Sequence, residues 1–152
     1  MTKLPTQRLP DWQTRLAALM ASRRTTPFAW GGQDCCLFAA DAVLAVTGHD
    51  PAADLRGTYT TATDALRVLN KAGGVAGVAI KRAGPVVAVA LAQPGDIGLL
   101  KLDVPNPLAA TALAVYGGSC WHAPGEHGLT SYPESAIVRA WRCTGTEPCP
   151  KL

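Results

Sequence analysis

The hydrophobic pattern of this chain changes once, near Gly73-Gly74, and this change limits the folds that it can adopt. Before it, apolar residues recur at three- and four-residue spacing, which predicts helices from Pro10-Asp11 to Arg23-Arg24, from Cys35 to Val46 and from Thr61 to Lys71. After it, short apolar runs separated by turn residues predict strands at Val86–Leu91, Asp96–Leu102, Thr111–Tyr116, Cys120–His122 and Ala136–Arg142. Helices followed by strands indicate an α+β fold, with N-terminal helices packed on an antiparallel sheet or meander.

Residues that favour helix ends support the boundaries of the second and third helices. Asp34 is placed to cap the second helix and Gly48 to end it. Thr61 or Thr63 is placed to cap the third, which Gly73-Gly74 would close.

A chain of 152 residues has the usual size of one domain. We assign residues 1–9 to an N-terminal arm, 10–143 to a single domain and 144–152 to a loose tail. The N-terminal residues lack the apolar core of a signal peptide, so export is not expected. Val86–Ala92 is the longest apolar run, and because a bilayer requires about 20 residues, no membrane span is predicted.

Charge is sparse and dispersed. Fourteen Lys and Arg against eleven Asp and Glu give a net charge of +3, with no basic stripe interleaved with aromatics, so nucleic acid is not an expected partner. Charged residues make up 16% of the chain, whereas about 25% is usual. We therefore expect part of the uncharged surface to be covered by another subunit or an assembly.

The five cysteines do not form the even, spaced set of a disulfide scaffold, because Cys35 and Cys36 are adjacent. The chain is therefore expected in a reducing compartment. Cys143 and Cys149 lie six positions apart and lack the paired spacing of a zinc ribbon. We interpret them as unrelated thiols and predict neither a metal nor a cofactor.

Cys35 is the candidate nucleophile. It follows Asp34 directly, and the free N–H groups at a helix start stabilise a thiolate. The alternative is that a small cysteine packs in an alanine-rich helix, and for Cys35 taken alone both readings stay open. For Cys36, one position further along, packing is the better interpretation.

A thiolate nucleophile needs a base, and the chain has three histidines. His49 is expected in a surface loop and His127 in a turn. His122, after Trp121 at a strand end, is placed to reach a helix start across a sheet. The alternative for His122 is a packed strand-end side chain.

Four blocks in order resemble the NlpC-type cell-wall peptidases, a papain-like superfamily. The first is Phe28-x-Trp-Gly-Gly followed by Asp34-Cys35, which resembles the nucleophile motif of that superfamily. The others are Gln93 to Leu100, Ala112 to Gly118, and Trp121 to Pro124. The resemblance spans residues 28–124 and implies a papain-like fold, with Cys35 as nucleophile and His122 as the orienting third member of a triad.

The sequence departs from these peptidases at the base. The resemblance places the general-base histidine at position 112, which is Ala112, and the neighbours Ala110 and Thr111 cannot accept a proton either. Phe28 also replaces a tyrosine common in the first block. The departure implies a degenerate, inactive peptidase, unless His122 is recruited as the base.

A second resemblance covers most of the chain. Leu9 to Trp12, Phe28 to Asp41 and Ala140 to Arg142 are similar to a small phage and prophage family of tail-assembly and tail-tip proteins. It implies a structural subunit, made in the host bacterial cytoplasm and located in the virion tail, beside the baseplate hub and the central tail-tip protein. The alternative is an active cysteine peptidase or amidase that cleaves peptidoglycan stem peptides. A thiol redox or acyl-carrying role for Cys35-Cys36 is a third alternative.

Overall fold

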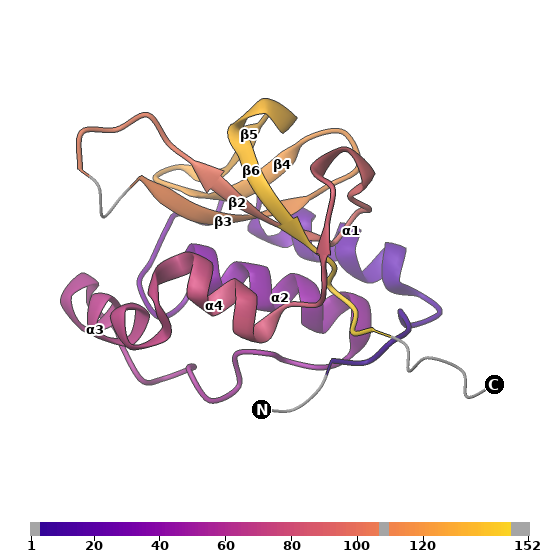
Figure 1. The fold of residues 1–152 in the computed structure, drawn as a ribbon, viewed down its shortest axis with the longest axis horizontal. Coiled ribbons are helices and arrows are strands. Elements are labelled where there is room, and N and C mark those ends of the chain that lie inside the picture. Colours follow the sequence, from indigo (N-terminus) through magenta and orange to yellow (C-terminus); the bar gives the residue numbers. More distant parts are fainter. Residues whose placement is uncertain (1–3, 107–109, 147–152) are drawn as a thin grey trace.

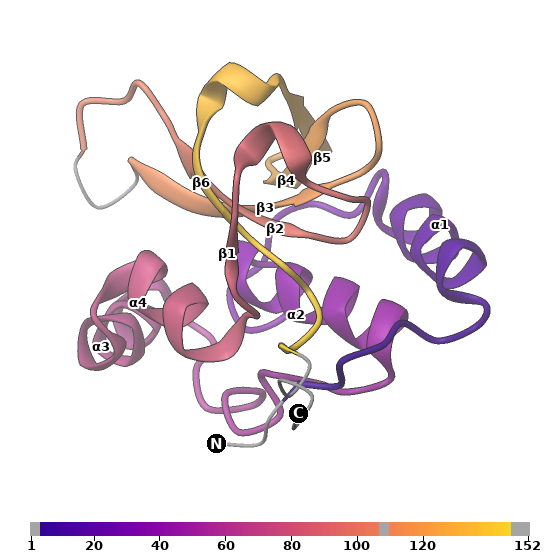
Figure 2. The ribbon, with the colours of Figure 1, turned by 45° about the vertical axis from the view of Figure 1, so that its right-hand side comes forward.

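The computed structural model describes residues 4–106 and 110–146, and within them the chain forms two layers. One layer holds four α-helices and the other a six-stranded antiparallel sheet in the order β1-β6-β2-β3-β4-β5. The elements are α1 (Trp12–Arg23), α2 (Cys35–Thr47), α3 (Ala62–Ala72), α4 (Gly74–Arg82), β1 (Val86–Val87), η1 (Val89–Leu91), β2 (Ile97–Lys101), β3 (Thr111–Tyr116), β4 (Trp121–Gly125), β5 (Gly128–Tyr132), η3 (Glu134–Ala136) and β6 (Ile137–Trp141). The helices lie on one face of the sheet, with α2 between α1 and α4 (Figures 1 and 2). The predicted α+β class is confirmed.

The predicted helix ends are confirmed where capping residues specify them. The Asp34 carboxylate accepts a hydrogen bond from the Leu37 N–H at 2.9 Å, and Thr61, not Thr63, caps α3. Gly48 and Gly73 end α2 and α3 in the left-handed conformation, with φ of 79° and 87°. These ends are encoded locally because each cap acts within its own turn.

The prediction that the chain turns to strands after Gly74 is wrong, because residues 74–82 form α4. This segment is apolar and contains two glycines, so it shows neither a polar face nor good helix propensity. Its glycine at position 77 has a packing role: a Cβ there would lie 1.9 Å from the Ala72 carbonyl oxygen. Val78 and Ala79 are buried under the sheet, so tertiary packing stabilises this helix.

The strand predictions are right at the centre of the sheet and wrong at its edges. β3 has the predicted bounds, whereas Val86–Leu91 forms only the short β1 followed by the 3₁₀ turn η1. β5 was not predicted. The predicted meander holds for β2 to β5, but β6 inserts between β1 and β2. Trp141 of β6 pairs with Ile97 of β2, a partner more than 40 residues away that local pattern cannot identify.

Alternate residues of β3 belong to two of the three hydrophobic clusters of the described core. Leu113 and Val115 face the helices and pack with the α2 residue Phe38 in the helix-side cluster. Ala112 and Ala114 face the other way and pack in the far-side cluster with Leu100, Trp121, Ile137 and Ala140. Side chains from η1, β5 and η3 pack against this second cluster.

The fully buried Asp96 carboxylate joins the two ends of the described chain to the sheet. It forms ion pairs with Arg142 at 2.8 Å and with Arg8 at 3.5 Å. It also accepts hydrogen bonds from the Gln93 and Cys143 N–H groups. The helices of the described part of the chain are all too short or too polar to cross a membrane.

Candidate functional site

Asp34 is the most constrained polar residue at the start of α2. Besides capping the helix, its carboxylate accepts hydrogen bonds from the Gly31 N–H at 3.0 Å and from the Tyr59 hydroxyl at 2.7 Å. The side chain is buried, and these three donors stabilise it. Asp34 therefore positions the turn that presents Cys35. The N-cap prediction is confirmed, whereas nothing in the sequence indicated Tyr59 as its partner.

Cys35 is the first residue of α2, as predicted, and its thiol is half-buried. A hydrogen bond from the Cys36 thiol is the largest influence on its pKa and lowers it, and the Leu113 backbone N–H acts in the same direction. The two sulfur atoms lie 4.0 Å apart. The same contact and burial raise the pKa of Cys36 well above its ordinary value. Cys35 is thus the more acidic thiol of the pair.

The residue of β3 that lies against Cys35 is a leucine, Leu113. The Cys35 sulfur meets the backbone of Leu113, whose side chain lies in the same helix-side cluster. Ala112, expected to occupy the base position, points to the opposite face of the sheet. Ala112 therefore does not face Cys35 in this fold. Neither the leucine nor the alanine side chain can accept a proton, so this stretch of β3 gives Cys35 no base.

His122 lies on β4, paired with Val115 of β3 and Ser131 of β5. Its ring contacts two side chains: Cys120 Sγ is 3.5 Å from Nε2 and Ser131 Oγ is 3.4 Å from Nδ1. Burial lowers the pKa of His122. The structure therefore gives the imidazole a thiol neighbour that sequence reasoning missed, although the Cys-x-His spacing was visible.

The ring of His122 lines an open groove of about 640 Å³ between α1 and the sheet. Gly117 makes room for it, because a Cβ there would lie 2.6 Å from Nε2. Apolar side chains of α1 and β5 form much of the wall, and Arg24 adds a positive charge.

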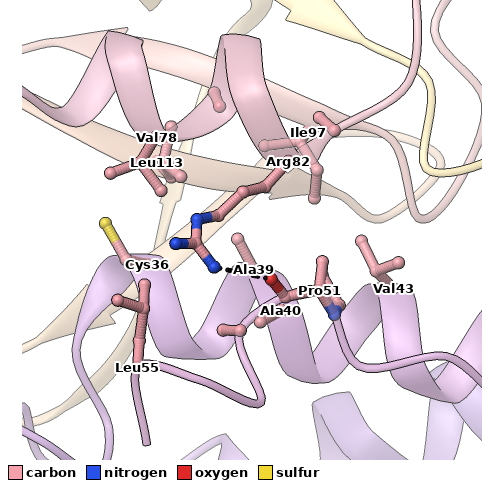
Figure 3. A pocket seen from close by; sticks show the side chains of 13 residues that line it. Cys36, Ala39, Ala40, Val43, Pro51, Leu55, Val78, Arg82, Ile97 and Leu113 are labelled. Atoms are coloured by element: carbon pink, nitrogen blue, oxygen red, sulfur yellow. Dashed lines mark hydrogen bonds between the residues drawn. The ribbon is translucent and has the colours of Figure 1, made fainter. Parts of the chain in front are cut away.

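A second, smaller cavity of about 30 Å³ lies between α2 and α4, beside Cys36. Arg82 reaches across it from α4 towards the Pro51 carbonyl, to which it donates at 3.0 Å (Figure 3). The guanidinium also binds the Asp54 carboxylate with two hydrogen bonds. The other side chains that line the cavity are mainly aliphatic.

The other predicted candidates lie apart from Cys35. His127 is exposed in the β4–β5 turn, as expected, and His49 follows the end of α2. Cys143 is buried beside Asp96, and burial raises its pKa to about 12, whereas Cys149 lies outside the described residues. Within residues 4–106 and 110–146 no three His, Cys, Asp or Glu side chains gather as metal ligands.

Comparison with known families gives one match. Residues 7–143 match the family described as domain of unknown function (DUF6950). The chain belongs to this family. No curated protein matches it significantly.

The DUF6950 domain includes all the elements of the fold, from α1 to β6. It contains Asp34, Cys35, Cys120 and His122. The contact between Cys35 and Cys36 and the contact between Cys120 and His122 therefore both lie within the family region. It also includes Arg8 and Cys143, which contact Asp96 from opposite ends of the chain.

Proposed function

We propose that this DUF6950 domain is a structural subunit of a bacteriophage tail tip or baseplate, built on a degenerate NlpC-type, papain-like fold. The motif resemblance to the tail-assembly family supports this proposal, and so does the order of helices and strands. In this proposal its partners are the baseplate hub and the central tail-tip protein, and it is located in the virion tail.

The proposal that peptidase activity has been lost depends on the groups that surround the Cys35 thiol. The sulfur meets Cys36 and the Leu113 backbone, whereas His122 contacts Cys120 and Ser131. A nucleophilic thiol requires a base within hydrogen-bond reach. The histidine best placed by sequence is therefore engaged with another thiol.

Exposed apolar side chains support a role in assembly. Leu91 is 65% exposed, Val86 58% and Val138 56%, and they lie on η1, β1 and β6, which contact one another. Val138 occupies an irregularity in the β2–β6 pairing, which turns it outward. A low-charge surface with protruding aliphatic groups is typical of a protein that is covered by neighbours.

The test uses a phage that encodes the chain and measures the structural role in the tail separately from peptidoglycan cleavage. We expect Cys35→Ala phage to assemble and infect at wild-type levels, and the protein to be found in purified virions by mass spectrometry. Loss of infectivity together with loss of peptidoglycan cleavage by the purified variant would contradict the structural role. Absence of the protein from virions and tail intermediates would contradict the proposed location.

The alternative is an active cysteine peptidase or amidase acting on peptidoglycan stem peptides. The lowered pKa of Cys35 favours it, because a thiolate is the attacking species. Purified wild-type protein would then release stem-peptide fragments and Cys35→Ala would not. Equal background release by both would exclude the alternative.

A further inference from the structure

The imidazole of His122 lies between a thiol and a hydroxyl. Nε2 faces Cys120 Sγ at 3.5 Å, and Nδ1 faces Ser131 Oγ at 3.4 Å. One tautomer satisfies both contacts: Nε2 accepts the thiol proton, and Nδ1–H donates to the serine oxygen. This is the order of groups in which an imidazole activates a nucleophile while a third group orients the ring.

Backbone pairing holds the three side chains together. His122 and Ser131 are direct partners across β4 and β5, so both project from the same face of the sheet. Cys120 immediately precedes β4, and its carbonyl accepts a hydrogen bond from the Gly117 N–H at 2.9 Å. The bare Cα of Gly117 leaves space for the ring. The cluster is therefore positioned by main-chain geometry.

The ring is suited to accept a proton at neutral pH, because burial lowers the pKa of His122 and favours its neutral form. Cys120 is the titratable group in contact with the ring, and Arg24, the residue after α1, is the charged side chain that lines the same groove. The thiol itself is partly exposed. It is thus open to a reagent while its base is partly shielded.

The groove beside the ring indicates the kind of molecule that fits. Its wall includes Leu16 and Met20 of α1 and Leu129 of β5, which offer an apolar surface. An acyl chain can pack on such a surface with its carbonyl carbon directed to the His122 ring, whose Nε2 contacts the Cys120 thiol.

We propose that Cys120, His122 and Ser131 form a thiol acylation site that accepts the acyl group of an ester or thioester. His122 Nε2 takes the Cys120 proton, and the sulfur forms a bond with the carbonyl carbon. The bond from that carbon to the leaving oxygen or sulfur breaks, and the leaving group takes the proton from Nε2. The product is an S-acyl Cys120, and no oxidant or reductant is required. This site is distinct from Cys35 and independent of the structural role.

The test uses p-nitrophenyl butyrate with the purified chain. We expect a stoichiometric burst of p-nitrophenolate and a butyryl group on the tryptic peptide that contains Cys120. General-base assistance contributes about 10²-fold or more, so we expect His122→Gln to slow acylation of Cys120 by at least about tenfold. Ser131→Ala is expected to slow it less, since serine only orients the ring.

Matched variants keep the result interpretable. His127→Gln removes the exposed histidine of the same hairpin, and Ser119→Ala removes an exposed hydroxyl beside Cys120; both should acylate at the wild-type rate. Cys120→Ser should fold normally by circular dichroism and lose the label at this peptide. Acylation of Cys120 at the same rate in folded His122→Gln, or no acylation of Cys120 in the wild type, would overturn the proposal.

Discussion

The Tyr59 hydroxyl donates a hydrogen bond of 2.7 Å to the Asp34 carboxylate, across 25 residues of chain. Through this bond the loop before α3 holds Asp34, the N-cap residue of α2. Burial and this contact raise the pKa of Tyr59, so the hydroxyl keeps its proton and donates at neutral pH. The start of α2 is therefore secured by tertiary contacts as well as by its own cap.

Tyr59→Phe should lower the free energy of unfolding by about 1.5–3 kcal/mol, because a buried carboxylate loses one of its donors. Urea titration followed by circular dichroism measures the change. Tyr116→Phe is the control, since it removes a hydroxyl bonded to the Gly118 carbonyl at the surface and should cost less. Equal losses in the two variants would show that the Asp34 contact adds nothing.

Asp96→Asn should be far more damaging, lowering the free energy of unfolding by about 3–5 kcal/mol. The substitution leaves the guanidinium groups of Arg8 and Arg142 facing a neutral amide at a buried site. Asp11→Asn, which breaks only the exposed pair with Arg15, should cost no more than about 0.5 kcal/mol. The denaturant concentrations at the unfolding midpoints of Asp96→Asn and Asp11→Asn measure this difference in stability. Similar midpoints would contradict the stabilising role of Asp96.

Cys36→Ala should move the alkylation of Cys35 to higher pH. The Cys36 thiol is the main cause of the lowered pKa of Cys35, so its removal reduces the thiolate fraction at a given pH. Iodoacetamide labelling of the Cys35 peptide from pH 6 to 10, read by mass spectrometry, gives the profile. Cys143→Ala is the control, because this buried thiol lies beside Asp96. An unshifted profile in Cys36→Ala would contradict the coupling.

His122 should make the protein less stable as the pH falls from 7 to 5. Its folded-state pKa lies below the unfolded value, so the unfolded chain takes up the proton first and unfolding is favoured below about pH 6.5. His122→Gln should flatten this part of the stability profile. If the free energy of unfolding of the wild type and of His122→Gln changed in parallel with pH, His122 would not be the cause of the loss of stability.

Leu91→Asp should leave folding intact and impair assembly, if the apolar surface on η1, β1 and β6 is an interface. Leu91 is 65% exposed, so its replacement should change the free energy of unfolding by no more than about 0.5 kcal/mol. Incorporation of the variant into tails, quantified by mass spectrometry, is expected to fall at least several-fold. Thr58→Asp, at another exposed position, is the control. Wild-type incorporation of Leu91→Asp would exclude this surface from the interface.

Short-range chemistry made several parts of the structure predictable. Asp34, Thr61, Gly48 and Gly73 act within one turn of their own helices, and the apolar run of β3 is bounded by its own turns. The placement of Cys35 in the first turn of α2 followed from the same local signals. These features depend on few neighbours, so the sequence alone determined them.

Tertiary packing decided the rest. α4 forms because Gly77 fits against the Ala72 carbonyl and Val78 is buried under the sheet, neither of which leaves a periodic signature. The side of β3 that faces Cys35 follows from strand alternation fixed by sheet pairing, which places Leu113 there and turns Ala112 away. His122 is next to Cys120 and Ser131 because a hairpin aligns them. Distances between such side chains depend on register and layer packing, which involve the whole chain at once.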